Sequence, residues 1–168
     1  TIFSQINTRA WGESLDILCE RLRRLYRAAM KNPSGGSACF INLDMEEYRD
    51  LRLTCELFKR VLNEDEFLKL RAGIVLQAYL PDSYELLEDL MAFARSRCER
   101  GGVPLKLRIV KGANLAMEQL EASHSHHTSA PFADKLSVDA HYKKMLELAL
   151  RAENARALNI GIASHNLF

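Results

Sequence analysis

The sequence predicts an α/β protein, and more closely a partial (β/α)8 TIM-type barrel of about four βα units. Helical and strand-like segments alternate along its 168 residues, and the strands begin about 32 to 53 residues apart. Such spacing fits strand–helix–strand units, which require a parallel sheet with helices covering it. A full barrel needs about 250 residues, so we expect residues 1–168 to form one incomplete barrel domain.

A doubly wound sheet would show the same alternation. The glycine-rich motifs GxGxxG and GxxxxGK[ST] mark nucleotide-binding sheets of that kind, and they follow none of the predicted strands. Polar side chains instead gather where each strand ends, and barrel enzymes carry their catalytic groups on that face. The barrel is therefore the preferred interpretation.

Composition and charge exclude several classes of protein. Hydrophobic residues make up 48% and charged residues 27%, a balance that excludes wholesale disorder. Lys+Arg number 23 against 22 Asp+Glu, which argues against binding nucleic acid through bulk charge. No apolar run approaches the ~18 residues of a membrane span. The four cysteines are widely separated, which predicts reduced thiols and a cytoplasmic protein.

The first half of the chain predicts two helices and two strands. The helix over Glu13–Ala29 is ended by turn residues, and a short apolar run, Ala38–Asp44, is typical of a buried strand. Helical spacing returns over Glu46–Leu62, and the β-branched run Gly73–Tyr79 predicts the second strand. The apolar face of the first helix consists of Leu15, Leu18, Leu22, Leu25 and Tyr26.

The second half continues the pattern. A helix over Tyr84–Arg100 is ended by the pair Gly101-Gly102, and Leu105–Lys111 predicts the third strand. The remaining segments are a helix, a polar loop, a helix and a strand, over 112–122, Ser123–Pro131, Ser137–Ala155 and Leu158–Ser164.

The polar strand ends predict a site at one rim of the sheet. Arg108 alternates with Leu107 and Ile109, so it points away from their face toward the barrel interior. A guanidinium there keeps its charge and needs an anion, an acceptor or water. The polar residues expected at this rim are Asp44, Gln77, Arg108, Lys111, Ser164, His165 and Asn166.

Four runs in this order, INLDMEEYRDL, GIVLQAYLPDS, LRIVKGANLAMEQLEA and IGIASHNLF, resemble the proline dehydrogenase domain of proline utilization A. That family is a flavin-dependent (β/α)8 barrel. The resemblance spans Phe3 to Phe168 and is most specific at Arg108–Ala113, close to the signature R-[LI]-V-K-G-A. Asn114 stands where the family often has tyrosine.

The resemblance implies FAD-dependent oxidation of L-proline to Δ1-pyrroline-5-carboxylate, with a hydride passing to flavin N5. It also implies a quinone electron acceptor, peripheral contact with the inner face of a membrane, and fusion to an aldehyde dehydrogenase domain. The family's first strands and its late helix with a carboxylate-binding arginine pair have no counterpart in this sequence. The resemblance therefore implies that residues 1–168 alone are inactive.

Two residues are expected to be catalytic by this resemblance. Arg108 would donate a hydrogen bond at flavin N5, and its alternative is a structural ion pair. Asp44 would lie at the active site near the substrate. It could equally cap the following helix, since it precedes Met45-Glu46-Glu47.

Cofactor contacts are implied for a larger set. Gln77 would bind the flavin pyrimidine edge, although a buried amide also bonds readily to backbone. Lys135, just before the long helix, would contact the phosphate-bearing half, or be solvated. The other residues implied to contact the flavin are Val110, Lys111, Gly112, Ala113, Ala163, Ser164, His165 and Asn166.

Three further interpretations stay open. A Schiff-base lyase or aldolase-type barrel would use Lys111 as its nucleophile. A non-catalytic fragment would self-associate through its open sheet edges. His124, His126 and His127 stand in a polar loop without nearby Cys, Asp or Glu at ligand spacing, which favours a solvated loop over a metal site.

Overall fold

A single parallel sheet organises the chain, as a computed structural model shows for residues 10–31, 39–45, 47–125 and 129–164. Its four strands pair in sequence order, β1 (Ile41–Leu43), β2 (Ala72–Gln77), β3 (Leu105–Val110) and β4 (Leu158–Ala163). Each neighbouring pair is parallel. Sequential parallel order is that of a barrel wall, whereas a doubly wound sheet reverses its strand order partway.

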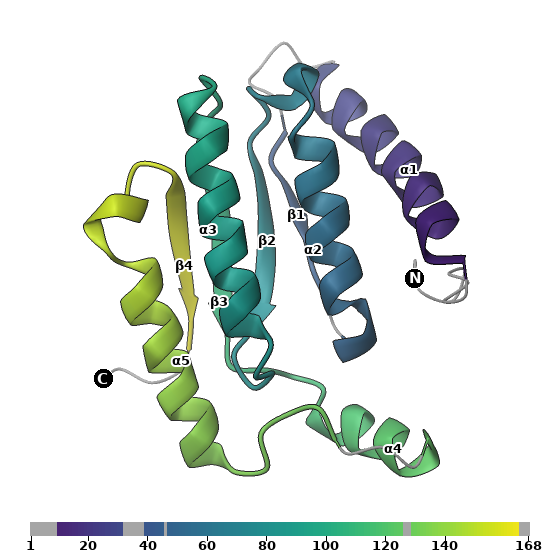
Figure 1. Cartoon of the computed structure of the whole chain (residues 1–168), viewed down its shortest axis with the longest axis vertical. Helices are drawn as coiled ribbons and strands as arrows, with labels where there is room; N and C mark the ends of the chain where they lie inside the picture. Colours follow the sequence, from purple (N-terminus) through teal and green to yellow (C-terminus); the bar gives the residue numbers. More distant parts are fainter. Residues whose placement is uncertain (1–9, 32–38, 46, 126–128, 165–168) are drawn as a thin grey trace.

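The helices lie along one face of this sheet, as Figure 1 shows for α2, α3 and α5. Helix α1 contacts α2, and α4 lies beyond the carboxyl ends of the strands (Figure 1). No described helix is long and apolar enough to cross a bilayer. The helices are α1 (Trp11–Lys31), α2 (Tyr48–Leu62), α3 (Ser83–Glu99), α4 (Leu115–Ser125) and α5 (Lys135–Ala149), with short 3-10 turns at η3 (Asp65–Phe67) and η4 (Ala152–Asn154).

Alternation along β3 separates the core from the open face. Leu105, Leu107 and Ile109 are buried, and Lys106 and Arg108 are exposed. Successive side chains of a strand point to opposite faces, so the buried set faces the helices and the two cations face the barrel interior. The direction predicted for Arg108 is confirmed.

The strand register aligns residues across that open face. Val75, Arg108 and Gly161 form one row, and Gln77, Val110 and Ala163 form the next row toward the carboxyl end. The site is therefore built on adjacent rungs of a rigid sheet.

Several predicted boundaries and faces are wrong for identifiable reasons. Strand β1 is shorter than predicted and only half-buried, because it pairs with β2 alone among the described strands. Leu25 lies outside the apolar stripe of α1 and is 58% exposed. Helix α4 runs to Ser125, into the predicted loop.

Helix α5 ends at Ala149 rather than at Ala155. Buried Asn154 donates from Nδ2 to the Leu148 carbonyl at 3.1 Å and accepts from Arg95 at 2.6 Å. These bonds fold the chain back into η4, so the helix cannot continue.

All four cysteines are free thiols, and Cys19 and Cys55 are buried.

A buried arginine fastens the amino-terminal end of the sheet. The side chain of Arg97, in α3, is 1% exposed. Its Nη2 donates to the carbonyls of Phe67 at 2.7 Å and Leu70 at 3.0 Å, and its Nη1 donates to that of Val103. Burial lowers the pKa of this guanidinium. Carbonyl oxygens accept from both of its terminal nitrogens, whereas its buried Nε has no hydrogen-bond partner among the described residues.

Candidate functional site

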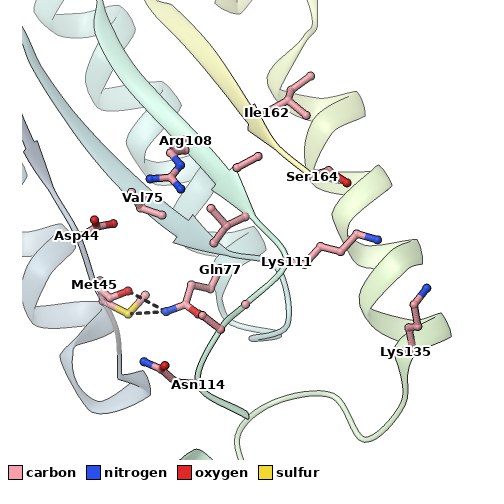
Figure 2. Close-up of a pocket in the computed structure, with 14 residues that line it drawn as sticks. Asp44, Met45, Val75, Gln77, Arg108, Lys111, Asn114, Lys135, Ile162 and Ser164 are labelled. Atoms are coloured by element: carbon pink, nitrogen blue, oxygen red, sulfur yellow. Dashed lines mark hydrogen bonds between the residues drawn. The ribbon is translucent and has the colours of Figure 1, made fainter. Parts of the chain in front are cut away.

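A cavity of about 870 Å³ opens at the carboxyl ends of the strands. Figure 2 shows its lining side chains, which come from β2, β3 and β4, from the segments after β1, β3 and β4, and from the first residue of α5. His165 and Asn166 lie outside the described residues. The cavity brings together every other residue predicted for the site, namely Asp44, Gln77, Arg108, Val110, Lys111, Gly112, Ala113, Lys135, Ala163 and Ser164.

Gln77 ends β2 at the floor of the cavity and is 4% exposed. Its Nε2 donates to the Met45 carbonyl at 2.7 Å and lies 3.7 Å from the Met45 sulfur (Figure 2). Ser83 Oγ donates to the backbone carbonyl of Gln77 at 2.7 Å. The alternative in which the Gln77 amide bonds to backbone is therefore observed, and this hydrogen bond fixes the direction of the amide.

Arg108 and Asp44 flank Val75 in Figure 2, with the guanidinium directed to the Asp44 side of the cavity. Both are exposed, and Arg108 forms no salt bridge with any described residue. The structural ion pair is therefore not found in this part of the chain. Asp44 does not cap α2, because that helix begins at Tyr48 and its N-cap residue is Glu47.

Two lysines at the edge of the cavity share one carboxylate. Lys111 Nζ donates to Asp139 Oδ1 at 2.5 Å, and Lys135 Nζ donates to Asp139 Oδ2 at 2.6 Å. These bonds, first that of Lys111, lower the pKa of Asp139 to about 2. Lys135 is the first residue of α5 rather than a residue before it, and its side chain is 82% exposed.

The carboxylate of Asp139 also bears on the lyase alternative. A Schiff-base lysine must present its amine to a carbonyl, whereas Lys111 Nζ forms a salt bridge with Asp139. This contact disfavours Lys111 as a nucleophile and suits it to hold a fixed positive charge.

Gly112 lets the backbone after β3 lie against an aromatic ring. Its φ is +142°, and a Cβ there would stand 2.4 Å from Cγ of Tyr79. The Tyr79 amide donates to the Lys111 carbonyl at 2.7 Å, which holds the ring under the loop. Glycine is required at this position both by backbone angle and by space.

We expect Gly112→Ala to destabilise the chain by about 3 kcal/mol, since it combines backbone strain with overpacking. Gly101→Ala is the matched control, because Gly101 also has a positive φ, +83°, but nothing lies within 4 Å of its Cβ position. The control should cost about 1 kcal/mol. Urea denaturation measures both, and equal costs would show that Tyr79 does not constrain residue 112.

Some cavity residues were not predicted for the site. Val75 lies two residues before Gln77 on the same strand face, so period-two alternation could have identified it. Met45 acts through its carbonyl, and Ile162 belongs to the row of Ile109 rather than that of Arg108. Neither has a signal in the sequence. Asn114 also lines the cavity.

The described residues contain no group of three His, Cys, Asp or Glu side chains arranged to hold a metal ion. His124 is exposed in α4, and its Nδ1 lies 3.0 Å from the Leu120 carbonyl. His126 and His127 lie outside the described residues.

The chain is similar to known proteins over nearly its whole length. The family described as Proline dehydrogenase matches residues 3–168. Proline dehydrogenase 1 of Bacillus subtilis (strain 168) is 28% identical over 163 residues, 97% of this chain. The structure of proline utilization A (PutA) from Corynebacterium freiburgense superposes with a TM-score of 0.88 at 48% identity over 96% of this chain. The structure of PutA from Bdellovibrio bacteriovorus inactivated by N-propargylglycine superposes with a TM-score of 0.85 at 39% identity over 97% of this chain.

These relatives are longer than the chain. It spans 44% of the Bacillus subtilis protein and 16% of each of the two PutA chains. Its four parallel strands and alternating helices match part of the barrel in the PutA structures, so the predicted fold class is confirmed.

Proposed function

The chain belongs to the proline dehydrogenase family, and from that premise we propose that it forms part of an FAD-dependent enzyme that oxidises L-proline to Δ1-pyrroline-5-carboxylate. The observation that carries the proposal is the cavity at the strand ends, which combines an oriented amide, an unpaired guanidinium and two ammonium groups among the described residues. Barrel enzymes place their active sites at this face.

The residues of the cavity fit a flavin dinucleotide. The pyrimidine edge of a flavin alternates acceptors and donors, which suits the fixed amide of Gln77. Its pyrophosphate needs positive charge, which Lys111 and Lys135 supply at one side. The loop at Gly112 has no side chain, so its backbone can approach a flat ligand closely.

Each catalytic residue then has a definite task. When bound, a flavin would supply the redox chemistry, acceptance of a hydride from proline. Arg108 donates a hydrogen bond where negative charge grows, and such donors act most strongly in the transition state. Asp44 places a negative charge at the same rim, suited to a substrate that carries an ammonium group.

We propose further that the chain is part of a bifunctional PutA-type protein with a fused aldehyde dehydrogenase domain. The two PutA structures at 39–48% identity support this assignment. In such a protein the electrons would pass to a quinone, which requires peripheral contact with a membrane. Alone, the chain would present the edges of β1 and β4 for pairing with another copy.

Titration of the chain with FAD, followed by flavin fluorescence, tests the proposal. We expect saturable binding, and about tenfold weaker binding by Gln77→Leu, since one hydrogen-bonding amide is lost. Gln119→Leu is the control, because Gln119 is exposed on α4 and does not line the cavity. A wild-type chain without affinity for FAD would contradict the proposed cofactor. An unchanged affinity in Gln77→Leu would contradict only the role of Gln77.

A further inference from the structure

Helix α4 carries one buried side chain on an otherwise exposed surface. Glu118 is 8% exposed, whereas Leu115, Met117 and Leu120 on the same helix are 43% to 61% exposed. Its Oε1 accepts a hydrogen bond from the backbone N–H of Tyr48 at 2.6 Å. Tyr48 is the first residue of α2 and lies 70 residues away in sequence. The carboxylate therefore satisfies one of the unpaired amides at the start of α2.

The two ends of this contact lead to two segments that line the cavity. On one side, the Glu118 amide donates to the Asn114 carbonyl at 3.0 Å, and Asn114 lines the cavity. On the other, Tyr48 follows the segment of Asp44 and Met45, and the Met45 carbonyl accepts from Gln77. A single side chain thus joins the loop after β1 to the loop after β3.

A second contact between α4 and α2 is a weaker type of interaction. Arg49 and Glu121 form an ion pair at 3.2 Å, but their side chains are 45% and 46% exposed. Exposed pairs of this type contribute little to stability. The hydrogen bond from the Tyr48 amide to the Glu118 carboxylate is part-buried, and a charge-assisted bond of this kind is stronger than an exposed ion pair.

We propose that Glu118 is a positioning residue that holds the loop after β1, with Asp44 and Met45, at a fixed spacing from the loop of Gly112 and Asn114. Through the Met45 carbonyl it also fixes the direction of the Gln77 amide. The structural claim stands on these contacts alone. Its consequence for flavin binding rests on the proposed function.

Three variants of the full chain test this role. Glu118→Ala removes the acceptor, Glu118→Gln keeps an oxygen that can accept from Tyr48, and Glu121→Ala is the control on the next turn of α4. Nuclear magnetic resonance without ligand follows amide exchange at Tyr48 and the side-chain NH2 resonances of Gln77. FAD titration follows in a separate measurement.

In Glu118→Ala we expect exchange at Tyr48 to accelerate about tenfold. The Gln77 resonances should shift or broaden, and FAD affinity should fall about tenfold. Glu118→Gln should restore all three, and Glu121→Ala should change each by less than about twofold. Unchanged Gln77 resonances in Glu118→Ala would overturn the positioning role whether or not FAD binds. If Glu118→Ala shifts the Gln77 resonances but the wild-type chain has no affinity for FAD, only the cofactor proposal is contradicted.

Discussion

Replacing Arg108 with methionine is expected to lower the rate of flavin reduction by proline by on the order of 10²–10³ in a complete barrel that contains this chain. Arg108 stands on the open face of β3 and forms no salt bridge with the described residues. Its guanidinium is thus available to a ligand in the cavity. Because its hydrogen bond strengthens as charge develops, the loss should fall on the chemical step.

The affinity for FAD should change far less than the rate. Stopped-flow reduction with proline measures the rate, and titration measures the affinity. Lys106→Met is the matched control, since Lys106 lies two residues earlier on the same face of β3 and does not line the cavity. Reduction of Arg108→Met at the wild-type rate would show that the assigned role is wrong.

The 168-residue chain alone is expected to show no measurable proline oxidation, even with added FAD and an artificial electron acceptor. Proline requires a cation for its carboxylate. The cations that line the cavity in the described chain are Arg108, Lys111 and Lys135. All three are assigned to the flavin in the proposed function, Arg108 at N5 and the two lysines at the pyrophosphate. Among the described residues, no cation of the cavity therefore remains for the substrate carboxylate.

A dye-reduction assay with proline tests this expectation, and FAD binding in the same sample shows that the chain is folded. Adding the remainder of a proline dehydrogenase barrel, fused or in trans, should produce activity. Turnover of proline by the chain alone would refute the argument from the cations.

The sheet and the polar residues at its rim could be predicted because both follow from local pattern, whereas Val110, Gly112, Ala113, Lys135 and Ala163 were implied by the family resemblance. Arg108 was placed on the open face by its alternation with Leu107 and Ile109, and the structure shows that alternation. Gln77 was found because an amide is unusual in an apolar strand. The end of β1 was predicted less well, since the pattern around Asp44 matched a helix cap that α2 begins too late to use.

What the sequence could not predict depends on contacts between distant segments. Asp139 lies 28 residues from Lys111, and Glu118 lies 70 residues from Tyr48. In the sequence, both are acidic residues of predicted helices with no feature that sets them apart. Only the fold shows that one holds two cavity lysines and that the other is buried at the start of α2.

At the amino-terminal end of the sheet, the buried Arg97 makes substitutions and changes of loop length differ in their expected effect on stability. Its two terminal nitrogens donate to main-chain oxygens, those of Phe67, Leu70 and Val103. Exchanging one side chain for another at these positions leaves the acceptors in place. An insertion or deletion there would move these carbonyl oxygens away and leave a buried cation without acceptors. We therefore expect this end of the sheet to tolerate changes of side chain more readily than changes of loop length.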